Sequence, residues 1–289
     1  MKKHLSTILL VAALLLGAGL MLYPTASNYW NSFHQSRAIA SYAQSVSELS
    51  AVDYERIWLD ALDYNRALSG RTIPFDMGEE ELEAYNSQLN ISGDGIMGYI
   101  EIPKIEVMLP IYHGTSDLVL QVAVGHIDSS SLPVGGESSH CVLSGHRGLP
   151  SARLFTDLDR LNEGDIFQLQ ILKETLTYEV DQIRIVLPSE MSDLAITKGQ
   201  DYCTLVTCTP YGINSHRLLV RGRRIDNPDS AAATRVTADA VRIDPVLVAP
   251  VAALPMLLLM AIWLIINPGG GKKKKKKNKK RESEPQPPS

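Results

Sequence analysis

Two side chains of complementary chemistry stand nine residues apart in a strand-like part of the sequence. Cys208 follows the apolar, β-branched run Tyr202–Thr207, and Arg217 stands just before the next apolar run. Pro210 and Gly212 lie between them and are typical of a turn. We expect two antiparallel strands that hold the thiol and the guanidinium at neighbouring strand ends. The spacing therefore predicts an active site with a cysteine nucleophile and an arginine that stabilises charge.

A cysteine nucleophile needs a neighbouring base, because a thiol pKa of about 8.5 leaves it mostly protonated at neutral pH. Seven histidines are present. His146, in the segment SGHRG, would project from a strand end into a loop flanked by glycines, where catalytic groups tend to lie. His126 has a similar setting and remains the alternative. His140 is expected to precede its strand, and His216 only to flank the arginine.

The elements that position these residues are predicted to be short strands. Eight short apolar runs with turn signals follow Gly93 within about 135 residues, which favours an all-β barrel or sandwich over βαβ units. We also expect a short helix at Leu154–Leu161. The runs are MGYIEIP, VMLPIY, VLQVAVGHI, HCVLSGHRG, GDIFQLQIL, LTYEVDQIRIV, DYCTLVTC and HRLLVRGRRI.

The region before these strands is predicted to be helical. Apolar residues recur at helical spacing from Ile39 to Leu49, and a second helical stretch covers Tyr54–Leu68. A loop rich in Pro and Gly, with Phe75 at its tip, then leads into an acidic helix. An exposed aromatic residue in such a loop is either a local packing anchor or a cover for something else.

Two uncharged apolar segments are long enough to cross a bilayer. Residues 5–23 follow Lys2 and Lys3 and are interpreted as a retained anchor, with a cleavable signal as the alternative. Residues 246–266 precede a lysine-rich tail and are interpreted as a second transmembrane helix that anchors to lipid. Because basic residues lie outside both segments, we expect both termini in the cytoplasm and the region between them outside the cell.

Charge is distributed unevenly along the chain, which has a net charge of −4. The tail holds nine basic and two acidic residues, and the N-terminus adds two lysines. The remaining 17 basic and 30 acidic residues give a formal charge of −13. This negative charge argues against nucleic acid as a partner and favours a basic or amine-bearing partner.

The cysteines indicate neither a disulfide scaffold nor a metal site. Cys141, Cys203 and Cys208 are an odd number, so at least one thiol stays unpaired within the chain. No pair has the C-x2-C spacing of a structural zinc site, and the histidines are scattered. We expect no cofactor and no metal. Cys141 and Cys203 lie inside strand runs and are expected to be small buried residues.

The run TLVTCTPYGINSHRLLVRG resembles the TLxTC signature of the sortase family. The sequence around it is similar to that of the class C sortases, which assemble pilins. The similarity runs in order from Gly93 to Arg224 through MGYIEIPKI, LPIYHGTS, SLPVGG, LSGHRGLPSARLFTDLD and GDIFQLQIL. It implies a mostly β fold, an eight-stranded sortase barrel with N-terminal helices and a lid loop. The two transmembrane helices predicted above, one on each side of the barrel, are also consistent with a class C sortase.

The resemblance also implies a reaction. Cys208 would attack the Thr–Gly bond of an LPxTG-like sorting signal at a pilin's C-terminus, and a lysine of the next pilin would resolve the thioacyl enzyme into an isopeptide bond. His146 would be the general acid and base. Arg217 would stabilise the oxyanion or hold the signal, and Thr207 would support the nucleophile. In the sortase barrel, the strands of Cys141 and Cys203 are neighbours, so the resemblance allows a contact or a disulfide between them.

The lid departs from the pattern of the class. Class C sortases carry an Asp-Pro-aromatic tip whose acid pairs with the arginine, whereas this tip consists of Ile73, Pro74 and Phe75. Phe75 is expected to cover Cys208, and Asp76 reaches Arg217 only along a different loop path. We therefore expect a lid held mainly by apolar contact.

The resulting interpretation is a membrane enzyme of a Gram-positive type of surface that polymerises pilins. The alternatives are a housekeeping sortase that attaches proteins to peptidoglycan and an inactive scaffold that binds pilins. The expected parts are a cytoplasmic N-terminus (1–4), an anchor or signal (5–23), an extracellular helical region (24–92) with a lid at about 71–78, a catalytic barrel (93–226), a stalk (227–245), a transmembrane helix (246–266) and a basic cytoplasmic tail (267–289).

Overall fold

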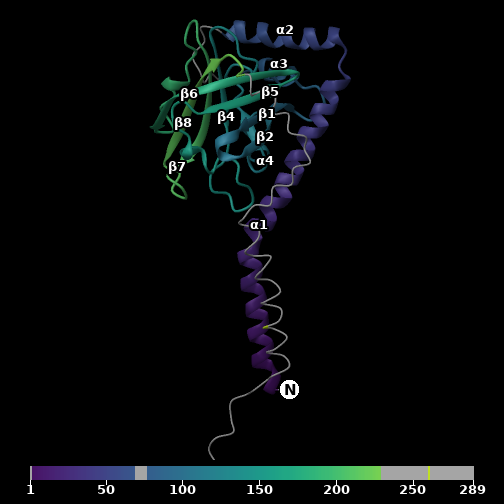
Figure 1. The fold of residues 1–289 in the computed structure, drawn as a ribbon, viewed down its shortest axis with the longest axis vertical. Coiled ribbons are helices and arrows are strands. Elements are labelled where there is room, and N and C mark those ends of the chain that lie inside the picture. Colours follow the sequence, from purple (N-terminus) through teal and green to yellow (C-terminus); the bar gives the residue numbers. More distant parts are fainter. Residues whose placement is uncertain (1, 69–76, 229–259, 261–289) are drawn as a thin grey trace, which may run out of the picture. The chain divides into compact units, whose positions relative to one another are not determined.

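The computed structural model describes residues 2–68, 77–228 and 260 (Figure 1). The chain divides into two units, Pro24–Ala240 and a second made of Met1–Tyr23 with Val241–Ser289. Four features expected from the sequence fall outside the described residues: the lid tip 73–76, the stalk beyond 228, the basic tail and, except for Met260, the helix at 246–266.

Three helices precede the strands: α1 (Lys2–Glu48), α2 (Ala51–Leu68) and α3 (Glu79–Ser87). Ser50 caps α2, because its Oγ accepts the backbone N–H of Asp53 at 3.1 Å. The buried residues of α2 recur at helical spacing: Ala61, Asn65 and Leu68. Three glutamates in the first turn of α3 favour its N-terminus through the helix dipole. The predicted helical region before the strands is therefore present.

Among the described residues, one helix is long and apolar enough to cross a membrane, where the sequence predicts two. This helix is α1, with a candidate span within Ile8–Glu48. It continues through Pro24 to Glu48, whereas the sequence suggests an apolar segment that ends at Tyr23. A proline inside a long helix removes one backbone hydrogen bond and does not end this helix.

The eight predicted strand runs form eight strands of one closed barrel. In chain order, they are β1 (Ile96–Ile102), β2 (Val107–His113), β3 (Val124–His126), β4 (Ser139–Ser144), β5 (Ile166–Ile171), β6 (Glu174–Val186), β7 (Asp201–Thr209) and β8 (His216–Ile225). Short helices lie between them: η1 (Pro103–Ile105), α4 (Asp117–Leu120), η2 (Leu158–Arg160) and η3 (Ser192–Leu194). Of the two architectures that the sequence allowed, a barrel and a sandwich, the structure is the barrel.

The strand order around the barrel is β1-β2-β3-β4-β7-β8-β6-β5. Strands β4 and β7 pair in parallel, from Ser139 opposite Asp201 to Ser144 opposite Val206. Strands β7 and β8 pair antiparallel. Strands β4 and β7 therefore end, and β8 begins, at the same end of the barrel. In Figure 1, helix α2 lies at the opposite end.

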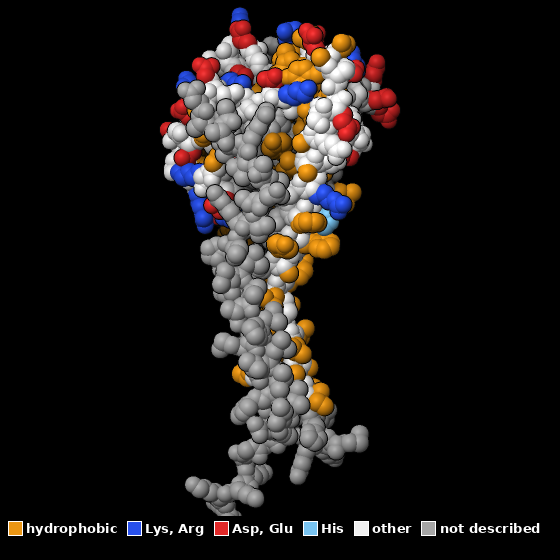
Figure 2. Space-filling view, turned by 45° about the vertical axis from the view of Figure 1, so that its right-hand side comes forward, with side chains coloured by type: hydrophobic (Ala, Val, Ile, Leu, Met, Phe, Trp, Pro, Cys, Tyr) orange, Lys and Arg blue, Asp and Glu red, His pale blue; other side chains and the backbone are white. Residues whose placement is uncertain are grey.

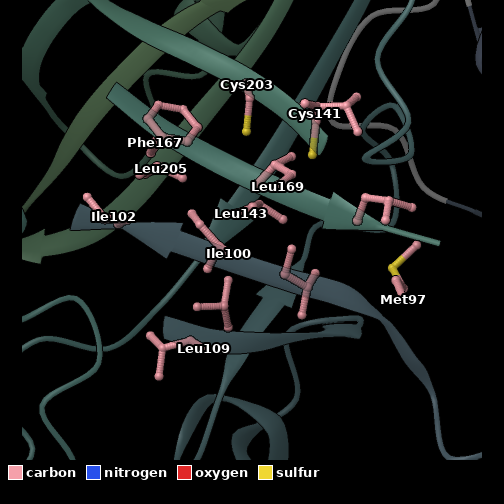
Figure 3. Close-up of a cluster of buried hydrophobic side chains, with 14 of the residues drawn as sticks. Met97, Ile100, Ile102, Leu109, Cys141, Leu143, Phe167, Leu169, Cys203 and Leu205 are labelled. Carbon is pink, nitrogen blue, oxygen red and sulfur yellow. The ribbon is translucent and has the colours of Figure 1, made fainter. Parts of the chain in front are cut away.

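The core fills the barrel with apolar side chains from the inward faces of the strands. Ile100, Leu143, Phe167 and Leu205 are fully buried there. Cys141 and Cys203 lie among such residues (Figure 3) and face each other in the β4–β7 register as free thiols. They are the small buried residues that the sequence leads us to expect, and they are not joined as a disulfide.

Two local expectations are wrong. Residues 154–161 form turns and the short 3₁₀ helix η2 in place of a helix, since Leu154 has a φ of +39°, which an α-helix does not allow. His140 lies inside β4, not before it, because the strand begins at Ser139. Its polar ring is accommodated in the sheet by two hydrogen bonds described below.

Candidate active site

The β7–β8 pair brings Cys208 directly opposite Arg217, as the spacing predicts. Strand β7 continues one residue past the cysteine, to Thr209. Both side chains are half-buried at the rim of the barrel. The Nη1 atom of Arg217 donates to the carbonyl oxygens of Asn214 at 3.3 Å and His216 at 3.2 Å. These bonds hold the guanidinium at its own turn, on the strand opposite Cys208.

His146 follows the end of β4 by two residues, as predicted. In the parallel β4–β7 register, Ser144 pairs with Val206, and Cys208 likewise follows Val206 by two residues. His146 and Cys208 therefore follow the two neighbouring strand partners at the same level. The backbone oxygen of His146 accepts a hydrogen bond from the N–H of Phe155 at 3.1 Å, which fixes the loop after β4.

Thr207 joins these two strand ends. Its hydroxyl is buried and donates to the carbonyl oxygen of Gly145 at 2.7 Å. Gly145 in turn donates its N–H to the Val206 carbonyl at 3.1 Å. A Cβ at Gly145 would meet the ring of Phe155 at 2.7 Å, so the position requires glycine. The predicted supporting residue thus contacts the segment that carries His146.

Arg147 is a residue of the site that the sequence reasoning missed. Its guanidinium pairs with Asp159 at 2.5 Å and donates to the hydroxyl of Thr209 at 3.4 Å, so it links the residue after His146 to the residue after Cys208. Its Nε is buried without a hydrogen-bond partner. Its position next to His146 in the segment SGHRG was the only signal in the sequence. Its partners Asp159 and Thr209 lie 12 and 62 residues away, so local sequence patterns do not reveal them.

The alternative base, His126, is not at the strand ends that meet at Cys208. It is fully buried, and its Nε2 lies 2.8 Å from the carbonyl oxygen of Ser131. Since a carbonyl only accepts, Nε2 carries the proton and Nδ1 accepts from the hydroxyl of Tyr85 at 2.9 Å. Both ring nitrogens are therefore occupied, and His126 holds α3 against the barrel.

His140 is also buried within the sheet. Its Nδ1 donates to the Ala195 carbonyl at 3.0 Å and its Nε2 accepts from the hydroxyl of Thr204 at 2.7 Å. Burial lowers the pKa of His140 to about 4, because the charged imidazolium would lose its hydration. His140 is therefore neutral near pH 7 and supports strand β7, which carries Cys208.

The acidic partner of Arg217 expected from class C sortases is not found among the described residues. No carboxylate in the part of the chain that the structure describes forms an ion pair with this arginine. Asp76, the candidate, lies outside that part. The described residues also contain no group of three His, Cys, Asp or Glu side chains suited to a metal ion.

A half-buried cysteine opposite an arginine in the strand register, with a histidine just past the end of the adjacent strand, suits covalent catalysis through cysteine. Comparison with known proteins agrees. The Sortase domain family matches residues 100–225. The structure of sortase C1 from Streptococcus agalactiae is similar at 55% identity with a TM-score of 0.65, covering 66% of this chain and 100% of that one. Sortase C of Streptococcus pneumoniae is 42% identical, with a TM-score of 0.60, covering 66% and 97%.

The chain therefore belongs to the sortase family, and these structural neighbours support its assignment to class C. Its relatives also support its assignment as a cysteine transpeptidase. Among curated proteins, Sortase D of Bacillus subtilis is 33% identical over 131 residues, which cover 44% of this chain and 63% of that protein. The chain thus matches less than two thirds of that relative's length.

Proposed function

We propose that this protein is a membrane-anchored transpeptidase that joins pilin subunits through isopeptide bonds. The observation that carries the proposal is the meeting of three strand ends, at which Cys208 faces Arg217 and His146 leaves the neighbouring parallel strand at the same level. The pneumococcal neighbour is described in terms of pilin substrate specificity, which supports the same class of substrate here.

In the first half-reaction, the thiol of Cys208 gives its proton to His146, and its Sγ atom attacks the threonine carbonyl carbon of an LPxTG-like sorting signal. The carbonyl oxygen becomes negatively charged in the tetrahedral intermediate, and the guanidinium of Arg217 donates hydrogen bonds to it. The Thr–Gly bond then breaks, and the leaving nitrogen takes a proton from His146. The result is a thioacyl enzyme and a released C-terminal peptide.

In the second half-reaction, the amine of a lysine on the next pilin attacks the thioacyl carbon. His146 accepts the proton that the amine loses, and the Cys208 thiolate departs. An isopeptide bond forms while the free enzyme is restored, so no cofactor is required. Thr207 acts through Gly145, because their hydrogen bond holds the two strand ends that carry nucleophile and base in register.

The proposed location is the cell membrane, with the catalytic barrel outside the cell and both termini in the cytoplasm. Helix α1 supports an N-terminal anchor by its length and composition. The basic tail after residue 271 supports a cytoplasmic C-terminus through the positive-inside tendency.

Full-length protein in liposomes, mixed with a pilin that carries an LPxTG-like signal, tests this function. We expect a ladder of pilin polymers that resists boiling in detergent, with a lysine–threonine isopeptide bond in the mass spectrum. Cys208→Ala should abolish the ladder, because no thioester forms. Cys203→Ala is the matched control, since this thiol is buried in the core, and it should keep the ladder.

Three outcomes would contradict the proposal. A ladder that persists with Cys208→Ala would identify another nucleophile. Cleavage of the signal with water as the only acceptor would indicate a protease. Transfer to a peptidoglycan stem peptide in preference to pilin would indicate a housekeeping sortase.

A further inference from the structure

Arg147 is a charged side chain held inside the protein, at the strand ends that form the site. Its side chain is 10% exposed, and its Nη2 pairs with Asp159 at 2.5 Å. Figure 2 shows positive and negative side chains intermixed on the surface, where an exposed pair such as Arg160 with Asp157 contributes little to stability. A buried guanidinium, in contrast, gives up its hydration and needs partners that the fold supplies.

The partners of Arg147 compensate its burial only in part. Its Nε is buried and has no hydrogen-bond partner in the part of the chain that the structure describes. Its Nη1 donates to the hydroxyl of Thr209 over a long distance of 3.4 Å. A buried donor without a partner costs free energy. An apolar residue would avoid this cost, so stability alone does not explain the arginine.

The two partners lie on different sides of the site. Asp159 belongs to η2, in the segment that follows the loop after β4. Thr209 is the last residue of β7 and comes directly after Cys208. One guanidinium holds both partners, because its N–H donors form a rigid planar fork. Arg147 therefore joins the loop after β4 to the end of β7.

The bond from Arg147 to Thr209 has a counterpart on the other side of the proposed base and nucleophile. Thr207 and Gly145, bonded at 2.7 Å, each precede one of these two residues along the chain. Arg147 and Thr209 each follow one of them. The parallel register of β4 and β7 is thus continued past the end of β4 by one side-chain bond before the proposed catalytic pair and one after it.

The loop that carries Arg147 has further bonds that preserve its fold. The N–H of Phe155 donates to the carbonyl oxygen of His146 at 3.1 Å, and the N–H of Gly148 donates to the hydroxyl of Thr156 at 3.1 Å. These two bonds join the loop to its own following segment and do not reach β7. Loss of the Arg147 side chain should therefore leave the loop folded and remove its link to the end of β7.

We propose that Arg147 is a positioning residue, which holds His146 level with Cys208 by bridging Asp159 and Thr209. The proposal rests on the roles given to His146 and Cys208 under the proposed function. Arg147 acts through the base and not on the substrate. Proton transfer between sulfur and imidazole requires a fixed geometry, and a small displacement of a catalytic group slows a reaction steeply. A variant without the bridge should therefore bind the sorting signal normally and turn it over slowly.

Three variants of the full-length chain separate positioning from charge. Arg147→Gln removes both the charge and the fork. Arg147→Lys keeps the charge, but a single ammonium does not hold both partners in the same geometry. Asp159→Ala leaves Arg147 in place and removes its charged partner, at a side chain that is 47% exposed. Arg160→Gln is the matched control in the same segment, because Arg160 is 67% exposed and Asp157 keeps its pair with Arg153.

Two readouts are measured for each variant at pH 7. The first is kcat and KM for cleavage of a fluorogenic sorting-signal peptide. We expect all three variants to lose about 10- to 100-fold in kcat, with KM within about twofold of the unmodified enzyme. The second is the rate at which iodoacetamide alkylates Cys208 in the free enzyme. It should fall by about fivefold, because a displaced imidazole no longer assists thiolate formation. Arg160→Gln should leave both readouts unchanged.

A direct effect of the Arg147 charge predicts a different pattern. Arg147→Lys would then keep both rates, and Asp159→Ala would speed alkylation, because removal of an acid favours the thiolate. Either result would overturn the proposal. Variants that unfold at lower denaturant concentration but keep kcat and the alkylation rate would assign Arg147 to the fold alone.

The half-exposed position of Asp159 keeps the test decisive. If the two Arg147 variants do not fold, Asp159→Ala alone decides between positioning and charge by the direction in which the alkylation rate changes. Alkylation needs no sorting signal, so it reports on the bridge even if the unmodified enzyme cleaves no peptide. A failure of this proposal is therefore distinct from a failure of transpeptidation.

Discussion

At the residue scale, the guanidinium of Arg217 is held for a directional task. Its Nη1 is bound to two carbonyl oxygens of its own turn, so the planar group is oriented before substrate arrives. A lysine at this position keeps the charge but loses the fork of parallel N–H donors. Charge alone therefore does not replace this side chain.

We predict that Arg217→Lys lowers kcat/KM for sorting-signal cleavage by about 100-fold, the effect of losing one oxyanion donor. Arg223→Lys is the control, because this exposed arginine lies on the same strand six residues from the site. Steady-state kinetics with a fluorogenic signal peptide measures both. Equal rates for Arg217→Lys and the unmodified enzyme would remove Arg217 from the chemistry.

The sequence pattern predicts Cys208 and Arg217 on either side of a turn between two apolar runs. It leaves His126 as an alternative to His146, and the resemblance to sortases selects His146. The pattern does not predict Arg147, whose partners come from distant segments. It also misplaces His140, since a polar residue at the start of an apolar run resembles a boundary. Only its hydrogen bonds to the Ala195 carbonyl and Thr204 allow it to lie within the strand.

At the element scale, the parallel β4–β7 pair sets the register between His146 and Cys208, the proposed base and nucleophile. Thr207→Val keeps the shape of the side chain and removes the hydroxyl that binds the Gly145 carbonyl. We predict a loss of about 1–3 kcal/mol of stability, because a buried acceptor loses its partner. A fall in kcat should accompany it, as the two strand ends separate.

The matched control for Thr207→Val is Thr175→Val. The hydroxyl of Thr175 donates to Gln170 at 2.7 Å in the β5–β6 hairpin, at the other end of the barrel. It should lose stability without losing kcat. Denaturant unfolding and single-turnover kinetics separate the two quantities, and a Thr207→Val enzyme with unchanged kcat would show that the bond only supports the fold.

The β elements are predictable as segments but not as a sheet. Alternating apolar runs and turn residues identify the strands from local patterns. The pairing of β4 with β7 joins residues 62 positions apart, and local periodicity contains no information on such contacts. Likewise, the expected helix at Leu154–Leu161 has helix-forming side chains, but tertiary contacts of its loop with Arg147 and His146 impose turns.

At the scale of the whole molecule, stability should depend on pH through His140. Its folded pKa of about 4 lies below the unfolded value of about 6.5. The unfolded chain therefore binds the proton first, and stability falls as pH drops from 6.5 to 4, by about 3 kcal/mol in total. The contribution is constant above and below this window. Arg221 and Asp181 lie near the ring, and Tyr202 packs edge-on against it.

Unfolding of the barrel by denaturant at several pH values measures this effect. We expect His140→Gln to flatten the slope between pH 6.5 and 4, because Gln has hydrogen-bonding groups but no proton to gain. His34→Gln, at an exposed histidine of α1, should leave the slope unchanged. An unchanged slope in His140→Gln would assign the acid sensitivity to other groups.

The thioacyl intermediate on Cys208 is the most direct test of the central claim. Full-length enzyme mixed with a sorting-signal peptide and no amine acceptor should gain the mass of the acyl fragment up to the threonine, and digestion should locate it on Cys208. The adduct should disappear when a lysine amine is added, with release of the joined product. An adduct on Cys141, Cys203 or another residue, or cleavage without any adduct, would contradict the account.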